Sequence, residues 1–223
     1  MFVGHLAIAL VAKRSVPRVN LAWLVGAVTA LDLVWPILVI AGIERVTIAP
    51  GATAFNPLVF DSYPWSHSLA MACVWGVVLY ALARWRHVTR SGARVIFLLV
   101  VSHWVLDFIS HTADMPLWPD LIGHSPRLGL GLWNSIPASY FAEGGMWLAA
   151  IVVYLSARPL RGWKSKLAFW SFTGVTTLLW ATVPWSPPPP SEQAIGWFAL
   201  IGGWLMIPWA WSADRRLPSH AHA

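Results

Sequence analysis

Three ionisable side chains recur at four-residue steps in an otherwise apolar stretch of the sequence. Residues 102–111 read SHWVLDFISH, which places His103, Asp107 and His111 four residues apart. Each step turns an α-helix by about 400°, so the three side chains drift by only about 80° and share one face. Imidazole and carboxylate groups are ligands of zinc and similar ions. The spacing therefore predicts a metal-binding helix face, with a hydrogen-bonded cluster that ties helices together as the alternative.

The axial spacing of these residues limits how they could share ions. His103 and His111 would lie about 12 Å apart along a straight helix, whereas zinc–ligand bonds are about 2 Å long. One ion cannot bind both histidines, so we expect His103 on one ion, His111 on another and Asp107 as a bridge. Paired ions about 3.5–4 Å apart are the usual arrangement in enzymes that split phosphoesters.

The composition of the chain indicates an integral membrane protein. Hydrophobic residues make up 57% and charged residues only 11%, against about 25% charged residues in soluble domains. Six apolar segments approach the ~20 residues needed to cross a membrane; they are 20–43, 65–84, 94–112, 139–157, 166–184 and 193–212, and a short helix at 2–13 precedes them. We expect an all-α, polytopic membrane helix bundle. It would form a single transmembrane domain over residues 1–223, with the metal site within 1–157 and two additional spans in 158–223.

The placement of basic residues predicts the orientation of this bundle. Lys and Arg stand in short runs between the apolar segments, a pattern of topology signals rather than of a phosphate-binding stripe, so no nucleic-acid partner is expected. If the run from Lys13 to Arg18 is cytoplasmic, loops 44–64 and 113–138 face outward, and only Arg45 and Arg127 of the 15 basic residues do so too. We therefore expect a protein of a bacterial-type cytoplasmic membrane with a cytoplasmic C-terminus.

Further ionisable residues in the apolar segments fall near the same outer side. They are His5, Asp32, His67 and Glu143. Ionisable groups are costly in a membrane and usually mark a functional site. Together with the three residues at 103–111 they could line one cavity that opens outward. In the outer loop, Asn134 is a candidate substrate-binding residue.

Short motifs around these residues resemble a known family. Gly4-His5, Leu31-Asp32, Ser66-His67-Ser68, and Ser102-His103 with Leu106-Asp107 are similar to motifs of the YdjM-like membrane-bound metal-dependent hydrolases, over roughly residues 1–157. The order of the residues is also similar to that in zinc-dependent phospholipase C and the zinc-dependent single-strand nucleases, whose ligands hold three zinc ions. The resemblance implies seven ligands, namely His5, Asp32, His67, His103, Asp107, His111 and Glu143.

Two departures from that ligand order bear on the number of ions. Ser139 stands where those enzymes have a histidine four residues before the final glutamate, and their N-terminal tryptophan ligand has no counterpart. The resemblance therefore implies two or three zinc ions, with manganese or another divalent ion as an alternative.

The favoured function is metal-dependent hydrolysis of a phosphoester in a lipid or lipid-linked substrate at the outer face. Ions at such a site lower the pKa of a bound water, and Asp32 is the candidate base that orients or deprotonates it. One alternative is a non-enzymatic metal-binding protein, either a carrier or a structural module; another is an acyl or amide hydrolase that uses the same ions. A carrier needs access from both faces, and the one-sided polar residues favour an enzyme. The expected partners are membrane lipids and the substrate, and the oligomeric state stays open.

Overall fold

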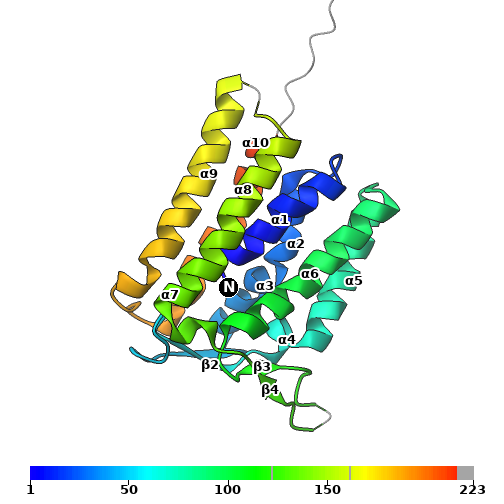
Figure 1. Cartoon of the computed structure of the whole chain (residues 1–223). Coiled ribbons are helices and arrows are strands. Elements are labelled where there is room, and N and C mark those ends of the chain that lie inside the picture. The colour runs from blue at the N-terminus through cyan, green and yellow to red at the C-terminus, as the bar shows by residue number, and fades with distance from the viewer. Residues whose placement is uncertain (122, 161, 215–223) are drawn as a thin grey trace, which may run out of the picture.

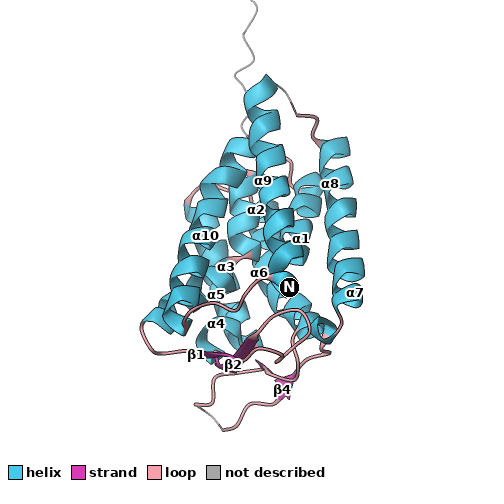
Figure 2. Ribbon diagram, turned by 90° about the vertical axis from the view of Figure 1, so that its left-hand side faces the viewer, coloured by secondary structure: helices cyan, strands magenta, loops and turns pink. Residues whose placement is uncertain are grey.

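The computed structural model describes residues 1–121, 123–160 and 162–214, and its described part is mostly helical with little sheet. The long helices run roughly side by side, and short strands lie at one end of the bundle (Figures 1 and 2). The elements up to residue 110 are α1 (Val3–Ser15), α2 (Leu21–Val28), α3 (Ala30–Ile40), β1 (Arg45–Ile48), β2 (Leu58–Ser62), α4 (Pro64–His67), α5 (Leu69–Trp85) and α6 (Arg90–Ser110).

The rest of the described chain adds a loop region and three long helices. The remaining elements are β3 (Met115–Pro116), β4 (Arg127–Leu128), η1 (Leu132–Asn134), α7 (Ile136–Ser139), η2 (Tyr140–Gly144), α8 (Gly145–Ala157), α9 (Gly162–Thr182), η3 (Val183–Trp185) and α10 (Glu192–Ala213). The antiparallel pairs β1–β2 and β3–β4 lie within the two long loops and were not predicted. The all-α expectation is thus confirmed for the bundle itself.

The number of membrane-crossing helices is smaller than predicted. Among the described residues, four helical stretches are long and apolar enough to cross a membrane, and they match the last four predicted spans. They are Arg90–Ser110, Ile136–Ala157, Gly162–Trp185 and Glu192–Ala213. A fifth span results if the bent pair α2 and α3 counts as one. The prediction of six spans is therefore wrong as stated, although the four helices do indicate membrane association.

Both missing spans are interrupted at a residue with a side-chain hydroxyl. The predicted span 20–43 bends by 52° between α2 and α3, where the Thr29 hydroxyl donates to the carbonyl of Val25 (2.8 Å). The predicted span 65–84 breaks at Ser68, whose extended backbone and hydroxyl cap the start of α5. The remaining helix α5 has 17 residues and falls among the shorter apolar helices. Such hydroxyls compete with helical hydrogen bonds, and a hydropathy pattern does not register this competition.

The short N-terminal helix lies at the centre of the bundle. Along α1, the side chains of Val3, Leu6 and Leu10 are fully buried. The helix packs against α2, α6 and α8, so it is surrounded by other helices. This central place puts one face of α1 against α6, the helix that carries the predicted metal-binding face.

The two ends of the bundle differ in charge. The N-terminus, both strand pairs and the loops that contain them lie toward one end, which we call the strand end (Figure 1). The turns that follow α1, α5 and α8 lie at the opposite end, with exposed basic residues such as Arg14, Arg86 and Lys164. Arg161, Arg215 and Arg216 lie outside the described residues. The separation agrees with the charge pattern, and the compartment that each end faces stays a prediction.

A buried ionic cluster fastens the last helix at the basic end. Asp214, directly after α10, accepts hydrogen bonds from the Lys13 ammonium (2.6 Å), the Leu21 backbone N–H (2.9 Å) and the Arg158 guanidinium (2.6 Å). Removing one member of a buried ion pair leaves an uncompensated charge, which is strongly destabilising. The last span, α10, is thereby tied to α1, α2 and the end of α8.

Candidate metal centre

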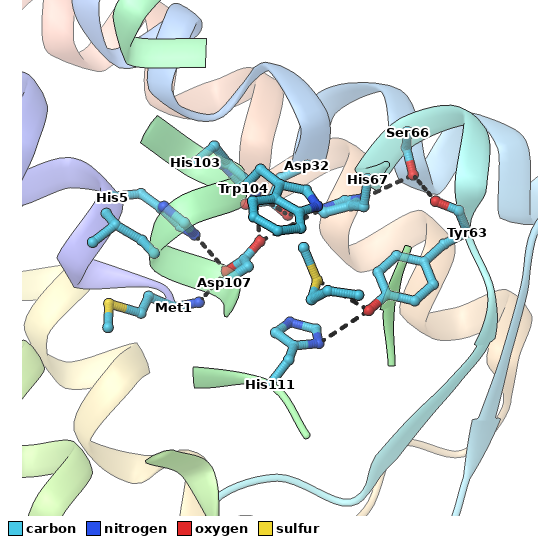
Figure 3. Close-up of polar contacts among 12 residues, drawn as sticks. Met1, His5, Asp32, Tyr63, Ser66, His67, His103, Trp104, Asp107 and His111 are labelled. Atoms are coloured by element: carbon cyan, nitrogen blue, oxygen red, sulfur yellow. Dashed lines mark hydrogen bonds and ion pairs between the residues drawn. The ribbon is translucent and has the colours of Figure 1, made fainter. Parts of the chain in front are cut away.

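Five of the seven predicted ligands come together in the folded chain. His5 lies on α1, Asp32 on α3, His67 on α4, and His103 and Asp107 on α6 (Figure 3). Two groups of three have ligand atoms within 4.8 Å of one another: His5 with His103 and Asp107, and Asp32 with His67 and His103. Buried histidine and aspartate clusters of this kind could hold a metal ion.

Local backbone structure explains how these side chains meet. His103 and Asp107 are four residues apart on α6, which brings Nε2 of one to 2.9 Å from Oδ2 of the other. The bend at Thr29 places Asp32 in the first turn of α3. The break at Ser68 leaves His67 as the last residue of α4. The bend at Thr29 and the break at Ser68, which shorten the predicted spans, therefore position two of the candidate ligands, Asp32 and His67.

In four histidine–aspartate pairs of the cluster, a ring nitrogen lies close to a carboxylate oxygen. Nε2 of His67 lies 3.5 Å from Oδ1 of Asp32 and 3.8 Å from Oδ2 of Asp107. Nε2 of His103 lies 3.7 Å and 2.9 Å from the same two oxygens. A tetrahedral ion with bonds of about 2.0–2.1 Å would separate its ligand atoms by about 3.3–3.4 Å. The four nitrogen–oxygen distances bracket this value, so each of these pairs is spaced as two ligands of one zinc-sized ion would be.

The hydrogen bonding of His103 also fits a metal ligand. Its Nδ1 lies 2.6 Å from the Val28 carbonyl oxygen, which can only accept, so Nδ1 carries a hydrogen. In the neutral ring, Nε2 then presents a lone pair towards the Asp107 carboxylate, and this buried nitrogen has no hydrogen-bond partner of its own. Two lone pairs that face each other repel unless a cation or a proton lies between them. Metal-bound histidines commonly donate their other N–H to a backbone carbonyl in this way.

The two oxygens of Asp107 face different partners. Oδ2 faces His67 and His103, whereas Oδ1 lies 3.0 Å from Nε2 of His5 and accepts a hydrogen bond from the Met1 amine. The amine also donates to Ser110 (2.8 Å), and sequence analysis assigned it no role. The Asp107 carboxylate is therefore placed to bridge two ions, one at each oxygen. His103 has one free lone pair, so it can bind only one of those ions.

Exposure distinguishes Asp32 from the other four residues. The side chains of His5, His67, His103 and Asp107 are at most 5% exposed, while that of Asp32 is 44% exposed. Asp32 is thus the member of the cluster that a water molecule or a substrate can reach.

His111 does not join the cluster. Helix α6 ends at Ser110, and His111 follows in an extended conformation, so the predicted stripe stops after two residues. Its Nδ1 lies 3.1 Å from Oδ1 of Asp114 and 3.3 Å from the Tyr63 hydroxyl. Burial, together with the nearby Asp114 carboxylate, raises the pKa of Tyr63 well above its usual value. The phenol therefore stays protonated and donates to Asp114 (2.7 Å).

Glu143 contacts the start of α1 rather than the clustered ligands. Its Oε2 accepts hydrogen bonds from the backbone N–H groups of Phe2 (2.9 Å) and Gly4 (3.4 Å), and its Oε1 accepts from Trp133 Nε1 (3.3 Å). The first N–H groups of a helix lack intrahelical partners, and a carboxylate there is stabilising. Glu143 thus caps the helix that carries His5.

Asn134 is exposed at the end of η1, in the turn before α7. Gly131, at the start of this turn, has a left-handed backbone (φ 72°), and a Cβ atom there would lie 2.7 Å from Nδ2 of Asn134. The Asn134 side chain therefore packs closely against Gly131 within the turn, and a contact between Asn134 and substrate stays a prediction.

Sequence reasoning missed Glu44, a buried carboxylate behind His67. Its Oε1 accepts from the backbone N–H groups of Trp65 and Ser66 (2.8 Å each), and its Oε2 accepts from the Ser66 hydroxyl (2.6 Å). Burial raises the pKa of Glu44, while the hydrogen bonds from Ser66 and Trp65 act in the opposite direction. No local signal could have identified this residue, because it precedes Ser66 by 22 positions in a long loop.

No protein family, curated protein or solved structure was found to match this chain. The similarity to the YdjM-like hydrolases thus stays a prediction from short motifs, and the function has to be argued from the site itself.

Proposed function

We propose that this protein is a membrane-embedded, metal-dependent hydrolase that cleaves a phosphoester of a lipid or lipid-linked substrate. One observation carries the proposal: Nε2 of His67 and Nε2 of His103 each lie within 2.9–3.8 Å of a carboxylate oxygen of both Asp32 and Asp107, as ligands of one ion would. Helix α6, which carries two of the ligands, is apolar and long enough to cross a membrane, and so are the stretches with α8 and α10 that pack against α1 and α3, which supports a membrane-borne substrate.

The donor atoms favour zinc at this site. Two imidazole nitrogens and two carboxylate oxygens suit zinc, and manganese is the alternative among divalent ions. A second ion would bind at Oδ1 of Asp107 and at His5, which makes Asp107 the bridge. Two ions are favoured over three, because the contacts of His111 and Glu143 lie with other residues.

The residues of the cluster have different roles in the proposed hydrolysis. Zinc can take a fifth ligand in the transition state, so an ion held by the two histidines and two aspartates would still have a position for a water or a phosphoryl oxygen, and it would lower the pKa of that water towards neutrality. Asp32 orients the attacking water and accepts its proton, because it is the exposed carboxylate of the set. The buried side chains of His5, His67 and His103 fix the site and exclude bulk water from its inner side.

The orientation follows from charge. With the basic end in the cytoplasm, the strand end and its metal site face the extracytoplasmic side, and the C-terminus is cytoplasmic. The substrate would then be reached from the outer leaflet.

The rival function is a structural, non-enzymatic metal module. The burial of four of the five ligands favours it, since structural metal sites are closed. A cluster without any ion would instead neutralise Asp107 with the Met1 amine and a protonated histidine.

The test is hydrolysis by the purified full chain in lipid nanodiscs. Metal is removed with a chelator, zinc or manganese is added back, and headgroup or phosphate release is measured from phospholipids and polyprenyl phosphates. We expect release from at least one lipid class only with metal restored, and none from Asp107→Asn. A folded, zinc-loaded protein that hydrolyses nothing in the panel would favour the structural module.

A further inference from the structure

Three residues form a hydrogen-bonded chain that leads from the strand end to the metal site. The Glu44 side chain, 1% exposed, lies 2.6 Å from the Ser66 hydroxyl, and the Ser66 hydroxyl lies 2.7 Å from Nδ1 of His67. Figure 3 shows the second of these contacts, with His67 pointing from Ser66 towards Asp32 and Asp107. The chain therefore ends on Nδ1 of His67, and the other ring nitrogen, Nε2, is one of the four ligand atoms of the proposed ion.

The direction of each hydrogen bond follows from counting hydrogens. With Glu44 ionised, its carboxylate only accepts, so the short contact between Oε2 of Glu44 and Oγ of Ser66 contains the one hydroxyl hydrogen of the serine. Oγ of Ser66 must then accept from Nδ1 of His67. With its hydrogen on Nδ1, the neutral ring presents a lone pair at Nε2. This is the nitrogen that lies 3.5 Å from Asp32 and 3.8 Å from Asp107.

We propose that Glu44 is a positioning residue that sets the tautomer of His67 through Ser66 and so prepares Nε2 to bind the ion. The inference rests on the proposed metal site. It assigns to Glu44 the part that the Val28 carbonyl plays for His103, where an acceptor also holds the hydrogen on Nδ1. Partners that orient metal-bound histidines typically affect metal affinity by 10–100-fold.

A purely structural role, in which Glu44 only anchors the start of α4, predicts that Glu44→Gln leaves the tautomer of His67 and the zinc affinity of the protein unchanged. Oε1 of Glu44 accepts the backbone N–H groups of Trp65 and Ser66 at the start of α4, and a neutral amide oxygen could do the same. In Glu44→Gln, the amide oxygen can keep these two bonds while the NH2 group faces Ser66. The serine hydroxyl is then driven to donate to Nδ1 of His67, which moves the ring hydrogen to Nε2.

The test combines histidine ¹⁵N NMR with zinc titration of the full chain in nanodiscs, with His67 assigned from the missing signal in His67→Gln. In metal-free protein we expect the Nδ1–H tautomer for the wild type and the Nε2–H tautomer for Glu44→Gln. Zinc affinity should fall by about 10–100-fold in that variant. Glu192→Gln, which changes an exposed acid at the start of α10, is the matched control and should change neither quantity.

A second variant keeps the inference testable if Glu44→Gln does not fold. Ser66→Ala leaves the two backbone bonds of Glu44 and removes only the link to His67, so zinc affinity should fall in it as well. Unchanged zinc affinity and an unchanged tautomer in a folded variant would overturn the positioning role. If the wild type binds no zinc, the proposed function fails, whereas the tautomer readout still tests the hydrogen-bond chain.

Discussion

At the scale of single residues, two aspartates of the same cluster have different surroundings. Asp107 is buried and its two oxygens face different partners, while the side chain of Asp32 is 44% exposed. A buried carboxylate with partners on both sides suits a bridge between ions. A carboxylate that water can reach suits a base, so the structure favours different tasks for the two residues.

Asp32→Asn should separate ion binding from turnover. The variant keeps the size and one oxygen of the side chain, so we expect bound metal to remain. Turnover should fall by roughly 10²–10⁴-fold, the usual contribution of a general base. Metal content and hydrolysis are measured on the same sample, with Glu192→Gln as the control. Full turnover would remove the base role, and loss of metal together with turnover would make Asp32 mainly a ligand.

Local spacing explains how far the site could be predicted from sequence. The pairing of His103 with Asp107 is a property of one helix, and four-residue spacing suffices to find it. The partners of Glu44 and Tyr63 are set by loops far away in the chain, so no spacing rule points to them. His111 was placed on the stripe because the end of α6 one residue earlier left no clear mark in the sequence.

At the scale of elements, helix interruptions and a helix cap determine the geometry. Hydropathy found the four long helices because each is a run of about 20 apolar residues. It did not find the bend at Thr29 or the break at Ser68, since a single hydroxyl barely changes the mean hydropathy of a segment. The same two positions bring Asp32 and His67 to the cluster. The two spans that were predicted wrongly are therefore interrupted next to residues of the candidate site.

Glu143→Gln tests whether Glu143 binds a metal ion, as the family resemblance implies, or only caps the start of α1. Glu143 accepts N–H groups from the start of α1 and from Trp133, and hydrogen bonds to charged groups contribute about 1.5–3 kcal/mol. The glutamine is neutral and keeps one acceptor, so we expect a lower melting temperature with the full metal content retained. Thermal unfolding and elemental analysis measure the two effects. Loss of metal at unchanged stability would instead support the ligand role implied by the family resemblance.

At the scale of the whole molecule, charge separates the two ends of the bundle. Exposed arginines and lysines stand at the turns after α1, α5 and α8. Asp107 of the candidate cluster lies in the last turn of α6, at the helix end that leads into the loop with β3 and β4 (Figure 1). Such an asymmetry orients membrane proteins with the basic end in the cytoplasm.

Cysteine labelling in cells tests this orientation. In a Cys73→Ser background, Ala54→Cys places an exposed thiol at the strand end and Ser91→Cys places one at the basic end. A membrane-impermeant maleimide should label the first in intact cells and the second only after lysis. The reverse pattern would put the cluster on the cytoplasmic side.

The central claim, that Asp32, His67, His103 and Asp107 hold an ion, is tested most directly by anomalous X-ray scattering at the zinc edge. The measurement uses crystals of the full chain prepared with zinc and without chelator. We predict a peak bonded to Nε2 of both histidines and to one oxygen of each aspartate, with bonds of about 2.0–2.2 Å. An ordered, zinc-supplied protein with no anomalous peak and with His103 hydrogen-bonded directly to Asp107 would contradict it.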